Sequence, residues 1–140
     1  MGLIPENELS RLAGVALDPV TGGPLVDERL ATSVPGVYAA GNVVHVYDLV
    51  DEVTASALRA GRHAAEHAAG HGDLGPAGLA LRAGANVRHV VPQALHQAAL
   101  RREPQHLEFR ARLPIEAPAE ARVMCGGEVV ASRRLRYARP

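Results

Sequence analysis

The chain has 140 residues, enough for one ordinary domain or two small parts with a shared core, and 47% of them are hydrophobic. Its 15 basic and 15 acidic residues cancel, so we expect no nucleic-acid partner, because phosphate binding needs an excess of positive charge. No apolar run approaches the roughly 20 residues that span a bilayer, and the N-terminus lacks a secretory pattern; we expect no membrane span and a cytoplasmic location. The single cysteine, Cys125, excludes an internal disulfide or a CxxC pair within the chain, and a small buried or half-exposed thiol is expected there.

Composition divides the chain into three segments. Residues 1–70 alternate short strand and helix signals, residues 71–86 are a Gly/Pro-rich linker, and residues 87–140 have the pattern of strands and turns. Residues 93–101 fit either a helical turn or an irregular crossover. The strands expected in the last segment are residues 87–91, 107–113, 121–125 and 129–137, with a hairpin turn at Gly126-Gly127 between the last two.

The first segment begins with a short helix and a hairpin. Pro5 suits the first turn of the helix, and Gly14 suits its C-terminal end. A Thr21-Gly22-Gly23 turn between residues 15–17 and 24–26 predicts the hairpin, because glycine adopts positive φ without a steric penalty.

A buried strand and a long helix complete this segment. Residues 37–40 (Val-Tyr-Ala-Ala) fit a buried parallel strand whose tip opens onto a ligand crevice. The helix is expected from about Asp51 to Ala69, capped by Asp48 or Asp51, and Gly61 within it suggests close packing against another backbone. The expected apolar side of this helix consists of Val50, Val53, Ala57, Ala60, Ala64, Ala65 and Ala68.

Four sequence pieces occur in an order typical of one protein class. Gly2-Leu-Ile-Pro-Glu-Asn7 is followed by the hairpin from Leu17-Asp18 to Val26-Asp27, by Thr32-Ser-Val-Pro-Gly-Val-Tyr-Ala-Ala-Gly-Asn-Val43, and by Gly61 with Ala64-Ala65. Taken together, residues 2–70 resemble the end of the FAD domain of two-dinucleotide-binding flavoproteins. This group includes disulfide reductases, thioredoxin reductase-like enzymes and NADH-dependent flavin oxidoreductases.

A narrower likeness rests on fewer residues. Leu-Ile-Pro-Glu-Asn-Glu-Leu near the start and the run from Asn42 to Asp51 resemble the branch associated with glycerol 3-phosphate dehydrogenase and with opine or sarcosine oxidase systems. The tail, with its His89-Val-Val-Pro-Gln93 run, is similar to a small β-rich extension of that branch.

The resemblance implies cofactor contacts at two places. Gly41, Asn42 and Val43 would meet the ribityl or pyrophosphate part of FAD, with Asn42 where the family usually has Asp. An Asn keeps an acceptor oxygen and adds a donor, so it can still bind a ribityl hydroxyl. Val50 and Asp51, at the start of the long helix, would approach the flavin pyrimidine through backbone N–H groups. The alternatives are an ordinary strand-to-loop turn at Gly41 and a plain helix cap at Asp51.

Histidines are the other candidate groups. His45 is a candidate proton donor or substrate contact, although a structural, hydrogen-bonded histidine is the commoner case; no other catalytic residue is predicted. The i, i+4, i+8 spacing of His63, His67 and His71 permits metal ligands, but charged residues between them favour a solvated face and glycines end the helix before His71. We therefore predict no metal site.

The sequence lacks a Gly-x-Gly-x-x-Gly loop in the required context, since Gly70, Gly72 and Gly75 do not follow a strand and open a helix. The expected fold is mixed α/β: the closing portion of a Rossmann-like FAD-binding domain, followed by a small antiparallel β domain. NAD(P) would enter only through an upstream domain. The expected function is that of a C-terminal fragment or subunit of an FAD-dependent oxidoreductase, inactive alone, whose partner is the remainder of the flavoenzyme in cis or as a separate subunit. The alternative is an interaction domain without activity.

Overall fold

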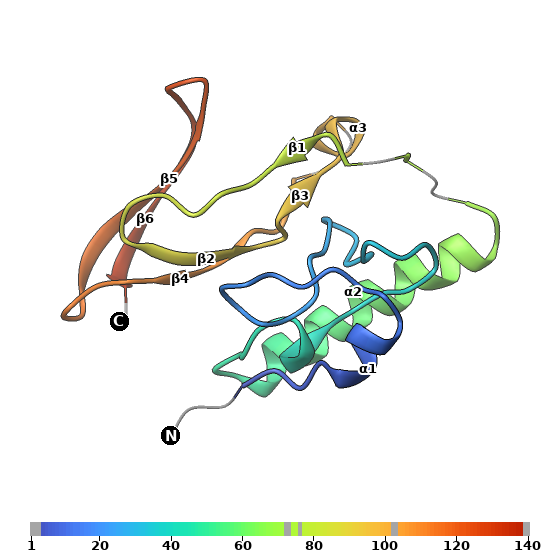
Figure 1. Ribbon diagram of the computed structural model, residues 1–140. Helices are drawn as coiled ribbons and strands as arrows, with labels where there is room; N and C mark the ends of the chain where they lie inside the picture. Colours follow the sequence, from blue (N-terminus) through green and yellow to red (C-terminus); the bar gives the residue numbers. More distant parts are fainter. Residues whose placement is uncertain (1–3, 72–73, 76, 102–103, 139–140) are drawn as a thin grey trace.

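The computed structural model describes residues 4–71, 74–75, 77–101 and 104–138. Turns and loops of the N-terminal half lie against one long helix, α2 (Val50–Ala68), and small antiparallel sheets of the tail lie on the other side of these loops (Figure 1). Two short helices, α1 (Glu8–Leu12) and the 3₁₀ helix η1 (Gly41–Val43), precede α2. None of the described helices is long and apolar enough to cross a membrane.

The first helix starts later than expected. Asn7 is its N-cap and Glu8 its first residue, so Pro5 lies before the helix. Gly14 follows the C-cap with φ of 75°, which confirms its expected role at the helix end.

The predicted hairpin forms, but with minimal strands. A single antiparallel bridge joins Leu17 and Pro24, and the backbone N–H of Asp18 donates to the Gly23 carbonyl at 2.8 Å. Residues 37–40 form no strand: Tyr38 makes one isolated antiparallel bridge with Ala31, and all three ladders of the described residues are antiparallel. A parallel strand needs a parallel neighbour for its hydrogen bonds, and the described segments place none beside residues 37–40. The Rossmann-like portion therefore stays a prediction.

Helix α2 agrees with the predicted range, but its buried side differs. Its N-cap is Leu49, without a side-chain hydrogen bond, so neither Asp48 nor Asp51 caps it. The buried residues are Ser56 and Ala60, while Val50, Ala57, Ala65 and Ala68 are exposed. Gly61 is exposed as well, with open space where a Cβ would be, so it does not serve close packing.

The described residues after α2 form three two-stranded sheets, and the first strand lies within residues 71–86, so the predicted linker is structured in part. Residues 87–91 form a strand as predicted, residues 97–100 form a helical turn, and the remaining predicted strands are present with shifted ends. The pairs are β1 (Leu79–Ala80) with β3 (Ala94–Leu95), β2 (Val87–Val91) with β4 (Glu108–Ala111), and β5 (Ala117–Cys125) with β6 (Glu128–Ala138); α3 (Gln97–Leu100) follows β3.

One core cluster joins the two halves of the chain. It contains Val26, Leu30, Ala39, Val44 and Ala60 of the N-terminal half together with Val91 of β2. Next to it, Gln93 donates its backbone N–H to the Val26 carbonyl and accepts the Val26 N–H at its side-chain Oε1, both at 3.0 Å. The tail is thus packed onto the N-terminal half.

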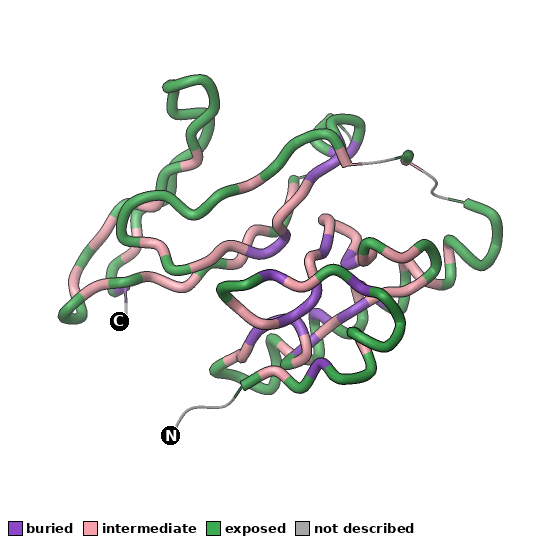
Figure 2. Tube along the Cα trace, viewed as in Figure 1, coloured by how far each residue is buried: buried purple, intermediate pink, exposed green. Residues whose placement is uncertain are grey.

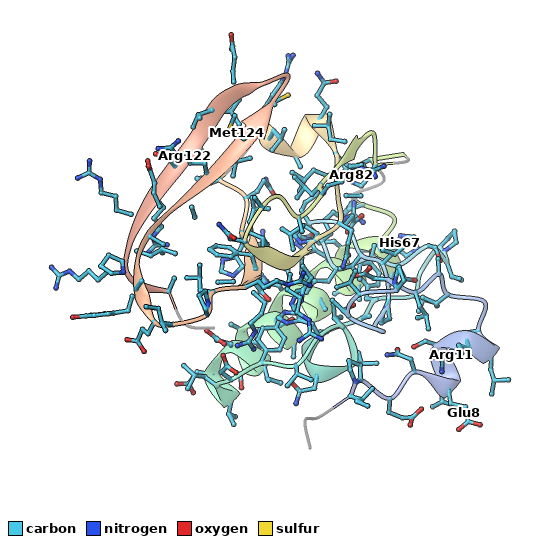
Figure 3. All side chains as sticks on the ribbon, turned by 60° about the vertical axis from the view of Figure 1, so that its left-hand side comes forward. Glu8, Arg11, His67, Arg82, Arg122 and Met124 are labelled. Atoms are coloured by element: carbon cyan, nitrogen blue, oxygen red, sulfur yellow. The ribbon has the colours of Figure 1, made fainter. Side chains whose placement is uncertain are left out.

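The β5–β6 hairpin extends away from this core; β6 is mostly exposed, whereas half-buried and exposed residues alternate along β5 (Figure 2). Gly126 and Gly127 form its turn with φ of 58° and 88°, as the two-residue turn requires. Cys125, next to this turn, is exposed and not buried or half-buried as expected. Arg122 and Met124 of the hairpin lie on the opposite side of the molecule from α1 (Figure 3).

Candidate functional site

Gly41 holds the η1 turn against α2. Its φ of 68° favours glycine, and a Cβ there would lie 3.1 Å from Cγ1 of Val53. Its backbone N–H donates to the buried Ser56 hydroxyl at 3.2 Å. The inward position of Ser56 on α2 follows from this bond, because a buried N–H requires an acceptor.

Asn42 is exposed, and half of its side-chain amide is engaged. Its Oδ1 accepts the backbone N–H of Tyr47 at 3.1 Å, which closes the loop between η1 and α2. A ligand on this side would therefore meet the donor Nδ2, the group that distinguishes Asn from Asp.

Asn7 links the η1 turn to the glycine turn of the hairpin through its side chain. It is 1% exposed, and its Nδ2 donates to the carbonyls of Gly22 and Val43, each at 3.0 Å. Its Oδ1 accepts from the Ser10 hydroxyl at 2.8 Å. A Cβ on Gly23 would overlap the Val44 carbonyl oxygen, so the glycine turn lies directly against the backbone of residues 43–44.

The first turn of α2 is open to solvent. Val50 is 78% exposed, Leu49 is 60% exposed, and Asp51 is also exposed. The side chain of the N-cap residue, Leu49, makes no hydrogen bond to the helix, and the positive end of the helix favours an acceptor there.

His45 is directed away from this turn, toward the tail. It is 8% exposed, and its Nε2 lies 2.8 Å from Oε2 of Glu108 on β4. Arg59 of α2 donates to Oε1 of the same carboxylate at 2.7 Å, and His106 Nε2 lies 3.2 Å from it. His45 is thus part of a buried hydrogen-bond network, the structural role that the sequence left open.

The network shifts the pKa of two neighbouring groups. Burial alone would raise the pKa of Glu108, but hydrogen bonds from His45, Tyr47 and Arg59 outweigh it and lower the pKa to about 2. Burial also raises the pKa of Tyr47, and its hydrogen bond to the Glu108 carboxylate adds to that effect. Glu108 therefore stays ionised, and Tyr47 keeps its proton, at any physiological pH.

His89, unlike the paired groups of the Glu108 network, has two buried ring nitrogens without a hydrogen-bond partner among the described residues. Its burial, together with electrostatic interactions with His45 and Arg110, lowers its pKa to about 4. Its ring lies 5.3 Å from that of His45, between centroids. It is neutral at physiological pH.

Two clefts open beside this network. One, of about 300 Å³, lies between residues 45–48 and β4. The other, of about 540 Å³, shares His45, His89 and Arg110 with it and adds Arg88 and Arg112. Of the predicted site residues, His45 lines both clefts, whereas Gly41, Asn42, Val43, Val50 and Asp51 line neither. The structure thus brings Gly41 to Val43 together against α2, but separates them from the clefts.

Sequence reasoning missed Glu108, Arg59 and Asn7. Asn7 had a usable signal, because an Asn that precedes a short helix is a common N-cap. Glu108 and Arg59 had none, since 49 residues separate them and neither belongs to a local motif.

The histidines of α2 do not form a site. His63 Nδ1 pairs with Glu66 at 3.0 Å, and the His67 ring contacts the Tyr38 ring edge-on at a centroid distance of 6.2 Å. His71 follows the helix, as expected.

This arrangement can do two things chemically. The η1 turn and the open end of α2 offer backbone and amide donors to an anionic or hydroxyl-bearing ligand. The Glu108 network holds its charges in fixed pairs, so it positions the loop of residues 45–48 and does not supply a free acid or base.

Comparison with known proteins bears on the ligand that the η1 turn and the start of α2 could bind. Residues 1–72, slightly more than half of the chain, match the family model described as pyridine nucleotide-disulphide oxidoreductase. No solved structure matches the chain. Members of this family typically bind a flavin and NAD(P). The matched segment includes the η1 turn and all of α2, and the chain therefore belongs to the pyridine nucleotide-disulphide oxidoreductase family.

Proposed function

We propose that this chain is the C-terminal part of an FAD-dependent oxidoreductase and that it contributes contacts to the ribityl chain and the isoalloxazine ring. The observation that carries this proposal is the seating of η1 on α2, in which Gly41 is bound to Ser56 and the first turn of α2 stays open. The family match covers both elements.

The residues fit a flavin in their donor chemistry. Asn42 would donate its Nδ2 to a ribityl hydroxyl while its Oδ1 stays bound to Tyr47. The backbone N–H groups at Val50 and Asp51 would stabilise negative charge on the pyrimidine side of the ring. The exposed side chains of Leu49 and Val50 offer apolar contact next to these donors.

The bound flavin would accept and pass on a hydride or electrons. The residues of this chain would orient the flavin. They would bind its reduced, negatively charged form more tightly than its oxidised form. NAD(P) would be held elsewhere in the enzyme. Within the family, we place the chain near the branch associated with glycerol 3-phosphate dehydrogenase and opine or sarcosine oxidase systems, on the basis of residues 3–9 and 42–51.

Apolar exposure supports a larger assembly. Ile4, Leu9, Leu12 and Leu58 are between 70% and 85% exposed, and three of them belong to or precede the short helix α1. We infer that these side chains of α1, α2 and the preceding residues are covered by the remainder of the flavoenzyme, in cis or as a separate subunit. Residues 37–40, by contrast, are buried or half-buried and provide no exposed apolar edge.

The test is to isolate the protein from its native cells through an affinity tag, together with whatever polypeptide remains attached. We expect about one FAD per chain in that assembly and none in the recombinant 140-residue chain. Asn42→Ala should weaken flavin retention about fivefold, because it removes one hydrogen bond of about 1 kcal/mol. Leu58→Ser, at a side chain that we infer to be covered by the remainder of the enzyme, should weaken assembly and so separates loss of assembly from loss of flavin.

An assembly that forms but contains no flavin would overturn the proposal and favour the interaction domain instead. If flavin retention is unchanged by Asn42→Ala and by Gly41→Ala, the chain is still part of a flavoenzyme, but these two residues do not contact the flavin.

A further inference from the structure

A second cluster of polar side chains lies on the other side of the core, between the two halves of the chain. Asp27 and Glu28 follow the N-terminal hairpin, and His96 lies between β3 and α3 (Figure 1). Their side chains are 13%, 4% and 6% exposed, respectively. His96 Nδ1 lies 2.9 Å from Oε1 of Glu28 and 3.8 Å from Oδ2 of Asp27.

The other ring nitrogen of His96 fixes its tautomer. His96 Nε2 lies 2.8 Å from the carbonyl oxygen of Gly75, which can only accept, so Nε2 carries a hydrogen. In the neutral ring, the lone pair of Nδ1 then faces two carboxylates. This contact is repulsive unless a cation lies between them or Nδ1 itself carries a proton. Metal-binding histidines characteristically donate their second N–H to a backbone carbonyl in this way.

Backbone donors fix one oxygen of each carboxylate and leave the other for the cluster. Asp27 Oδ1 accepts the N–H groups of Arg29 and Ala31, both at 2.9 Å, while Oδ2 is the atom near His96. Glu28 Oε2 accepts the backbone N–H of His96 at 3.0 Å, while Oε1 faces the ring. The three ligand atoms are therefore oriented before any ion arrives.

We propose that Asp27, Glu28 and His96 bind a divalent transition-metal ion, with Zn²⁺ as the best-matched ion. The three atoms lie within 4.8 Å of one another. Bonds of about 2.0–2.2 Å in a tetrahedron separate ligand atoms by roughly 3.4 Å, so the 2.9 Å pair opens and the 3.8 Å pair closes slightly. One imidazole and two carboxylates suit Zn²⁺, and water takes the fourth position.

The site contains ligands from both halves of the chain, so a bound ion would link the N-terminal half to the tail. Two ligands come from the family-matched segment and one from the tail. Binding would stabilise the packing of the tail on the N-terminal half, because an ion that binds only the folded form shifts the unfolding equilibrium. This inference is independent of the flavin proposal, which involves different residues.

The experiment uses the untagged chain, or its native assembly, after treatment with a chelator. Titration with Zn²⁺ should show one ion per chain, and Co²⁺ should give the intense visible absorption of a four-coordinate site. His96→Gln and Glu28→Gln should each weaken Zn²⁺ binding at least tenfold. His63→Gln is the matched control, because it breaks another histidine–carboxylate pair at 3.0 Å and should leave binding unchanged.

A measurement on the unaltered chain covers the case in which the variants fail to fold. Nitrogen-15 NMR of His96 reports whether Nδ1 carries a proton before and after Zn²⁺ is added. Loss of that proton, or a Zn²⁺-induced shift of a bare Nδ1, supports the site, as does a rise in melting temperature that chelator reverses. A proton that remains on Nδ1 in excess Zn²⁺ would overturn the proposal, because an imidazolium between two carboxylates then accounts for the cluster. Zn²⁺ binding of equal strength in wild type, His96→Gln and Glu28→Gln would overturn it as well.

Discussion

The Glu108 carboxylate, on strand β4 of the tail, accepts a hydrogen bond at 2.7 Å from the Arg59 guanidinium in the middle of α2. The same carboxylate binds His45, in the loop before α2. One side chain of the tail thus ties the loop between η1 and α2 to the middle of α2.

Glu108→Gln tests this link. The substitution removes the charge shared by Arg59 and His45 and should lower the free energy of unfolding by about 1.5–3 kcal/mol, the usual range for hydrogen bonds to charged groups. Urea unfolding followed by circular dichroism provides the measurement. The matched control is Glu120→Gln on β5, whose partner Arg122 is exposed, and its effect on stability should be far smaller than that of Glu108→Gln. Equal effects of the two substitutions would contradict a special role for Glu108.

Stability should fall in acid in two stages. The lowered pKa of His89, about 4 against 6.5, means that the unfolded chain binds more protons between these values, so stability falls as pH decreases from about 7 to 4. The lowered pKa of Glu108, about 2 against 4.5, continues this loss between about pH 5 and 2. Both contributions are fully present at neutral pH.

Two variants separate the stages. His89→Gln should flatten the free energy of unfolding between pH 7 and 5, and Glu108→Gln should flatten it only below about pH 5. Unfolding curves at several pH values check this assignment. A wild-type profile that is flat from pH 7 to 5 would rule out the buried, neutral His89.

Asn7 and Asn42 allow an isosteric comparison. Asn7→Asp replaces the amide that binds the Gly22 and Val43 carbonyls with a buried carboxyl, so we expect a loss of about 1–3 kcal/mol or more in the free energy of unfolding. Asn42→Asp keeps the acceptor for the Tyr47 N–H at an exposed position and should change stability by less than about 0.5 kcal/mol. Thermal and urea unfolding of both variants decide the matter. A destabilising Asn42→Asp with a neutral Asn7→Asp would reverse the roles that the structure gives them.

Gly41 and Gly61 provide a second matched pair. Gly41→Ala places a Cβ 3.1 Å from Val53 at a positive φ, which should cost about 1–2 kcal/mol. Gly61→Ala, in the exposed middle of α2 with open space at the Cβ position, should stabilise the chain by about 0.5–1 kcal/mol. The two melting temperatures should therefore move in opposite directions. A stabilising Gly41→Ala would show that the η1 turn relaxes into another conformation.

The sequence predicted those helices, strands and turns whose formation depends on neighbouring residues in the chain. The range of α2, the strand at residues 87–91, the Gly126-Gly127 turn and the helix-ending Gly14 all follow from periodicity or glycine conformation. Strand pairing in residues 37–40 was wrong because it depends on neighbours and not on the run itself.

The site was predictable only in part, for a similar reason. Gly41 could be identified from its motif, and its φ of 68° gives a conformational reason for glycine there that the motif alone did not supply. Ser56 was missed on the buried side of α2, because it faces inward to satisfy one distant N–H and not to bury apolar surface. The Glu108 network and the cluster of Asp27, Glu28 and His96 join residues that are 49 to 69 positions apart, and no spacing rule reaches that far.

The paired hydrogen bonds between Gln93 and the backbone of Val26 have a consequence for the integrity of the molecule. Gln93 satisfies both backbone groups of Val26 beside the shared core cluster, so the contact between the halves does not rely on the covalent connection that precedes β1, residues 71–78. A chain cut by a protease within that connection should remain together as a nicked, non-covalent complex. Two separately expressed pieces should likewise reassemble, each lending the other the partners that its own backbone lacks.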